Sequence, residues 1–124
     1  MGKAVKDLTF DAALAKAATG SRIVVCSGEP ANFAGIAAVT LADDALTPGD
    51  GNGDFVIADG SVSGRKVTVS QQANATIDAS GTATHVSIDD GANLLLVTTC
   101  TSQVLTSGGT VTIPTFAWEI TDPT

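Results

Sequence analysis

The sequence has few of the residues from which active sites are built. It contains one histidine, two cysteines and no tyrosine. A hydrolase needs a nucleophile, a base and an orienting acid, and no G-x-S-x-G segment surrounds any serine. The lone histidine, His85, alternates with Val86 and Ile88, which predicts a surface or interface residue rather than a base. We therefore expect no catalytic residue, no cofactor and no enzymatic activity.

Charged residues are also scarce, at 15% of the chain, and the net charge is −7. Nucleic-acid backbones are bound by clustered positive charge, whereas the 6 basic residues are scattered along this sequence. The composition therefore argues against nucleic-acid binding. A surface of Thr, Ser, Ala, Asn and Gly loses little entropy on burial, which suits a subunit of an assembly.

Long apolar runs are absent. No stretch approaches the roughly 20 apolar residues that span a bilayer, and MGKAVKDLTF has no apolar core of the signal-peptide type. We expect that the protein folds in the cytoplasm and does not associate with membranes. A chain of 124 residues predicts a single domain covering 1–124.

The two cysteines, Cys26 and Cys100, have no C-x-x-C spacing and no obvious companion, so we expect no metal site on them. Two interpretations remain open. They are reduced thiols that the fold treats as small hydrophobes, or they form disulfides, within the chain or between subunits, outside the reducing cytosol. Cys100 is the better candidate for a cross-link, because we predict a strand end there.

The loop TPGDGNGD resembles the start of a calcium-binding loop. Asp50, Asn52 and Asp54 have the spacing of its first three ligands. The pattern then fails, because Ser61 occupies the position where a bidentate Glu would close the shell. We predict a Gly/Asn/Asp turn without a metal.

Hydrophobic periodicity predicts an all-β, mostly antiparallel fold, a small β-sandwich or barrel with one N-terminal α-helix. The helix is expected at about 7–19, with an apolar stripe at Phe10, Ala13, Leu14 and Ala17. Strands are expected between about 22 and 121, at 23–26, 37–42, 55–57, 65–69, 75–79, 84–89, 94–97, 111–113 and 116–120. The segment 32–46 also fits a loosely helical conformation, and we favour a strand at 37–42 within it.

The C-terminal half carries most of the large apolar residues. Residues 94–97 are apolar at every position, as expected where both faces of a strand are covered or where a helix packs over the sheet. We predict a turn after Cys100. Phe116 and Trp118 alternate as inward-facing residues, which favours a place in the core over stacking on a sugar or a base.

Two basic residues, Arg65 and Lys66, begin one of the predicted strands. They are interpreted either as a solvated strand end or as an interface that meets an acidic patch on a partner subunit. Together with His85, they are our candidate interface residues.

The segments GTATH, VTTCTSQ and EITDP, with VVCSGEP and SGRKVTV upstream, resemble a family of small proteins encoded among the virion genes of tailed bacteriophages and prophages. The resemblance extends from about Asp11 to the C-terminus and includes no catalytic motif. It implies a virion component, such as a β-rich decoration, minor capsid or collar protein.

We therefore expect a non-enzymatic protein that decorates or cements the capsid by binding the major capsid protein and copies of itself. Many weak contacts on a lattice add up, so a homo-oligomer is expected, either a trimer on a capsid or a ring around the neck. The alternatives are a collar, neck or tail-associated protein, and a receptor- or glycan-binding module on a virion fibre.

Overall fold

The computed structural model describes residues 5–122, in which nine strands form three antiparallel sheets. The helices are α1 (Asp7–Ala17), the 3-10 helix η1 (Phe33–Gly35) and α2 (Ile36–Val39). The strands are β1 (Arg22–Cys26), β2 (Thr40–Ala45), β3 (Phe55–Asp59), β4 (Arg65–Val69), β5 (Gln72–Thr76), β6 (Gly81–Asp89), β7 (Leu94–Leu105), β8 (Thr110–Ile113) and β9 (Phe116–Ile120). The predicted fold class, mostly antiparallel β with an N-terminal helix, is confirmed and is consistent with a small β-sandwich.

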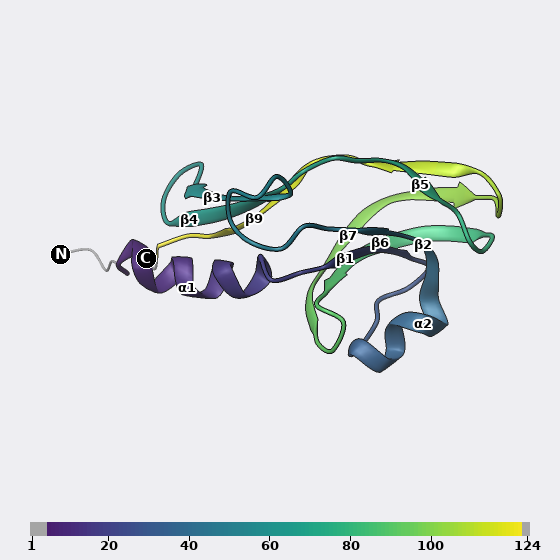
Figure 1. Ribbon diagram of the computed structural model, residues 1–124, viewed down its shortest axis with the longest axis horizontal. Helices are drawn as coiled ribbons and strands as arrows, with labels where there is room; N and C mark the ends of the chain where they lie inside the picture. The colour runs from purple at the N-terminus through teal and green to yellow at the C-terminus, as the bar shows by residue number, and fades with distance from the viewer. Residues whose placement is uncertain (1–4, 123–124) are drawn as a thin grey trace.

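The strands form two facing layers (Figure 1). One layer is a four-stranded sheet with the order β2-β1-β6-β7, which we call sheet A. The other layer holds sheet B, with the order β3-β4-β9, and sheet C, with the order β5-β8. The helix α1 packs against β3 and β4 of sheet B, and α2 lies on the side of sheet A away from the other layer.

Alternation along the strands fills a core between the two layers. Ile23 and Val25 of β1 face this core and lie opposite Ile88 and Val86 of β6 in the strand register. Phe55 of β3 enters from the other layer and is fully buried. The period-2 pattern is why the sequence predicts β6 correctly, whereas β1 is predicted by its run of β-branched residues.

The helix α1 is two residues shorter than predicted. Phe10, Leu14 and Ala17 of its predicted stripe are buried, whereas Ala13 is exposed to solvent. The buried stripe is therefore narrower than the spacing suggests, although the helix contacts β3, β4 and β7.

A second, smaller cluster lies on the outer face of sheet A. Val24 and Cys26, which alternate with the core residues of β1, pack against Ile36 of α2. The predicted strand over 37–42 is therefore wrong in its first half. The chain makes helical turns there, which begin where the Asn32 side chain accepts a hydrogen bond from the Gly35 amide.

The strand β7 departs most from the sequence prediction, because it continues through Cys100 instead of turning there. Its pairing with β6 is irregular at this point. Along β6 the register advances two positions, from Ala83 to His85, while it moves four positions along β7, from Gln103 to Thr99. Residues 100–102, within the polar segment TTCTSQ, thus form a bulge inside a 12-residue strand, and bulges and turns share a similar composition.

Candidate assembly interface

One side of the sandwich is open along β7. This strand is the last of sheet A, and β8 and β9 are edge strands of the facing layer. Within residues 5–122, no strand other than β6 pairs with β7. We call the gap between β7 on one side and β8 and β9 on the other the open seam.

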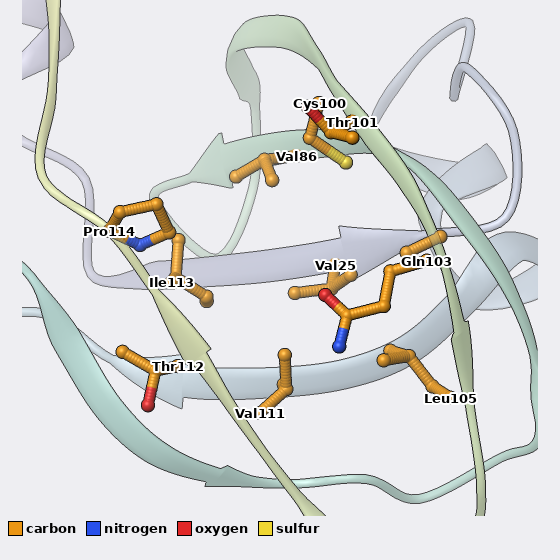
Figure 2. Close-up of a pocket in the computed structure, with 11 residues that line it drawn as sticks. Val25, Val86, Cys100, Thr101, Gln103, Leu105, Val111, Thr112, Ile113 and Pro114 are labelled. Atoms are coloured by element: carbon orange, nitrogen blue, oxygen red, sulfur yellow. The ribbon is translucent and has the colours of Figure 1, made fainter.

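Next to β8, the seam widens into a pocket of about 180 Å³ (Figure 2). Val25 and Val86 of sheet A and Ile113 of β8 point into it, and Cys100 and Gln103 approach it from β7. Clefts that bind small molecules usually measure about 300–1,000 Å³. The pocket is therefore an uncovered part of the core rather than a substrate cleft.

Next to β9, the seam forms a groove of about 290 Å³ in which Phe116 and Trp118 face the first half of β7. Both aromatic residues lie on the inner face of sheet B, as predicted, because they pair with Val69 and Val67. Trp118 nevertheless keeps 40% of its surface exposed, since β9 is the edge strand of its sheet. The prediction that Trp118 belongs to the core is therefore only partly right.

The strand β7 lacks the features that protect exposed edges in most proteins. Its sequence, LLLVTTCTSQVL, has no charged residue and no proline over 12 residues. The opposite edge of sheet A, β2, carries Asp43 and Asp44 and lies against β5. The outer strands of sheet B, β3 and β9, are five residues long and contain Asp59 and Glu119. Charges and short length normally block pairing between edges, so β7 is the described strand best suited to pair with another chain.

Residues 94–97 are apolar on both faces of the strand, and the sequence predicts that both faces are covered. In the structure all four side chains are only half-buried. Further along the strand, Val104 keeps 76% of its surface exposed. The single chain therefore leaves this strand incompletely covered.

The predicted interface residues lie on two different sheets. Arg65 starts β4, and its guanidinium donates hydrogen bonds of 2.8 Å to both Asp11 and Asp59. These two bonds, with Asp11 first, raise the pKa of Arg65 further above its ordinary value. Arg65 thus links α1 to sheet B through hydrogen bonds. Its role at an interface with another subunit stays a prediction.

Lys66 and His85 also stay predicted interface residues. Lys66 is half-buried and lies opposite Glu119 of β9 in the strand register. His85 is in the middle of sheet A, where its Nδ1 atom lies 2.9 Å from the hydroxyl of Thr84. Neither residue borders the open seam.

Both cysteines are free thiols. Cys26 is fully buried on the outer face of sheet A, with its sulfur 3.6 Å from the Ser87 hydroxyl, whereas Cys100 packs against the core on the inner face. A bridge between them does not fit side chains on opposite faces of one sheet. Burial raises the pKa of both thiols, which makes them weak nucleophiles. A bridge between subunits stays a prediction for Cys100, which lies inside β7 and not at a strand end.

The loop with the calcium-like spacing is a structured turn in which the acidic side chains bind the chain's own donors. Asp50 accepts a hydrogen bond from the Ile57 amide. The donors to Asp54 are the Thr47 amide, the Ser70 hydroxyl and the Gln72 side-chain amide. Within residues 5–122, no group of three or more His, Cys, Asp or Glu residues is arranged to hold a metal.

Acid should weaken this loop. The hydrogen bonds from Ser70 and Thr47 hold the pKa of Asp54 below its ordinary value of 3.8. A carboxyl group with a lowered pKa in the folded state stabilises the protein above its unfolded pKa, and this contribution is lost as the pH falls through the folded pKa. We expect the free energy of unfolding by urea, measured from pH 5 down to about 2, to fall less steeply with decreasing pH in Asp54→Asn than in the wild-type protein. Equal slopes in Asp54→Asn and the wild-type protein would contradict the assignment.

No protein-family model, curated protein or solved structure matches this chain. In the part of the chain that the structure describes, no helix combines the length and the hydropathy needed to cross a membrane. The fold and the seam define a small antiparallel β protein with a helix at one end and an open, uncharged sheet edge.

Proposed function

We propose that this chain is a non-enzymatic structural protein of a tailed bacteriophage particle. It decorates or cements the capsid by binding the major capsid protein and copies of itself. The observation that carries the proposal is the unpaired, uncharged edge of β7 beside the half-exposed Trp118. The resemblance of the sequence to virion proteins supports the assignment to a bacteriophage particle.

The geometry favours assembly over chemistry. His85 lies 2.9 Å from the Thr84 hydroxyl through its Nδ1 atom, and it lies opposite Cys26 in the register of β6 and β1. Cys26 has no exposed surface, and burial raises the pKa of its thiol. A thiolate that attacks a substrate needs access and a lowered pKa, so this pair does not support catalysis.

The surface chemistry fits a protein repeated on the outside of a shell. Each contact along an uncharged strand edge is weak by itself, but a lattice multiplies it through effective concentration. The net charge of −7 keeps assembled particles apart and makes contact with packaged DNA unfavourable.

Particle composition and shell binding test the proposal. Mass spectrometry of purified virions should detect the chain, and the pure protein should sediment with empty shells. We expect Trp118→Ala to weaken shell binding at least about tenfold, because half-exposed tryptophans at the centre of apolar grooves dominate interfaces. Val62→Ala, which truncates a residue that is 93% exposed, is the matched control. Absence from virions together with no binding to shells would refute the proposal.

A second function, a receptor- or glycan-binding module on a virion fibre, is favoured by Trp118 alone, because an exposed indole can stack on a sugar ring. Quantitative mass spectrometry separates the candidates. A decoration protein is present in many copies per virion, a collar, neck or tail-associated protein in fewer, and a receptor-binding module in very few.

A further inference from the structure

We infer that the free edge of β7 pairs with β7 of a second copy of this chain. The two strands run antiparallel about a twofold axis, so that sheet A continues from one copy into the other. This inference rests on the self-association included in the proposed function, and it assigns that association to one surface.

The backbone of β7 provides the pairing groups. A strand with one neighbour has amide and carbonyl groups free along its other side, and these form a ladder with any extended strand of suitable register. Two identical strands related by a twofold axis are antiparallel by symmetry, so each copy offers the other a complementary edge. The strand has two irregularities against β6, one at Leu95 and one between Thr99 and Gln103, which leaves residues 96–99 as the regular segment for pairing.

The distribution of acidic residues favours the edge of β7 for contact between two copies. Each chain has a net charge of −7, so two copies repel unless they meet where acidic side chains are absent. The other long edge of sheet A contains Asp43 and Asp44, and the outer strands of sheet B contain Asp59 and Glu119. Residues 94–105 contain no acidic residue, and β7 is longer than the other uncharged edge strands, β5 and β8, so it is the longest edge along which like-charged copies can meet without acidic side chains.

The side chains of β7 also match a second copy of themselves. Residues opposite each other in an antiparallel pair point to the same face of the sheet. With the twofold axis at the centre of residues 96–99, Leu96 lies opposite Thr99 of the second copy and Val97 lies opposite Thr98, so no charged side chain is brought to the axis. The half-buried Leu96 and Val97 gain cover from these threonines.

Pairing at β7 also affects the groove that holds Trp118. The added strand runs along the mouth of the seam, beside the segment of β7 that lines this groove. Trp118 is the only tryptophan in the chain, so the tryptophan fluorescence of the protein reports on this groove alone. We expect its emission to shift to shorter wavelength as the protein dimerises.

Sedimentation equilibrium with two lysine variants tests the inference. Thr99 is an exposed residue of β7, and Thr76 is an exposed residue of β5 in sheet C. A lysine on an edge strand blocks pairing, and twofold symmetry places two of them in the dimer. We expect Thr99→Lys to raise the dimer dissociation constant at least about tenfold, while Thr76→Lys leaves it unchanged. Hydrogen exchange at residues 96–99 should slow as the wild-type concentration rises.

Four results would overturn the inference, and three of them come from the pure protein. These three are a wild-type protein that stays monomeric at millimolar concentration, a dimer whose residues 96–99 exchange as fast as in the monomer, and a Thr99→Lys protein that dimerises as well as Thr76→Lys. Protection of β7 that requires added empty shells would assign the edge to a foreign strand and would also overturn it. If the protein is present in virions but is monomeric in solution, only this inference is refuted. If the protein forms a β7-dependent dimer but is absent from virions and does not bind shells, only the proposed function is refuted.

Discussion

Replacing Arg22 with alanine is expected to lower the free energy of unfolding by about 3–5 kcal/mol. The Nε atom of Arg22 lies 2.9 Å from a carboxylate oxygen of Asp89, whose side chain is 1% exposed. Asp89 also accepts a hydrogen bond from the Gly91 amide, which shapes the turn between β6 and β7. Without Arg22, a buried carboxylate loses its counter-charge, and this costs more than the pair contributes by itself.

An exposed ion pair on the same side of the turn is the control. Lys16 lies 3.9 Å from Asp90 and is 64% exposed, so Lys16→Ala should cost at most about 1 kcal/mol. Urea denaturation of both variants measures the difference. Adding Asp89→Asn to Arg22→Ala should restore part of the lost stability, because it removes the unpaired charge. Equal losses for Arg22→Ala and Lys16→Ala would show that burial of Asp89 does not set the effect.

Gly64→Ala is expected to cost about 2–4 kcal/mol, from backbone strain and from overlap with a neighbouring strand. Gly64 has a φ angle of +70°, and an added Cβ atom would collide with the carbonyl oxygen of Ile120 at the end of β9. A backbone atom in a sheet has little room to move. The substitution should therefore disturb the pairing of β4 with β9 and, through it, the environment of Trp118.

Gly91→Ala separates the two causes. Gly91 also has a positive φ angle, +90°, but an added Cβ atom there would meet no atom within 4 Å. We expect a loss of about 1 kcal/mol from strain alone and no change in tryptophan emission. Thermal unfolding and fluorescence spectra of the two variants measure both effects, and identical spectra for Gly64→Ala and wild type would argue against the contact with Ile120.

The seam was only partly predictable, although all its parts are visible in the sequence. Residues 94–97 and Trp118 stand out as apolar, and alternation correctly places Trp118 on the inner face of its strand. What the pattern does not contain is that both β7 and β9 end their sheets. The exposure of an inward-facing residue depends on whether another strand pairs with the outer side of its own strand. Such pairing involves chain segments that are far away in the sequence.

Charged residues illustrate the same limit. Arg65 is predicted either as a solvated strand end or as an interface residue, because its neighbours in the sequence include no clear partner. In the structure it binds Asp11 on α1, 54 positions earlier in the chain, as well as the nearby Asp59. The two cysteines are similar, since only the register of sheet A places Cys26 and Cys100 on opposite faces.

The amino-acid sequence by itself determined the helix, most of the strands and the poverty of charged and catalytic residues, because periodicity and composition act over a few neighbouring positions. Only the tertiary structure decided which strands became edges, that β7 passes through a bulge instead of a turn, and that Trp118 stands half-exposed beside it. Strand pairing joins residues that are distant in the chain, and the free edge left by that pairing is where another chain can bind.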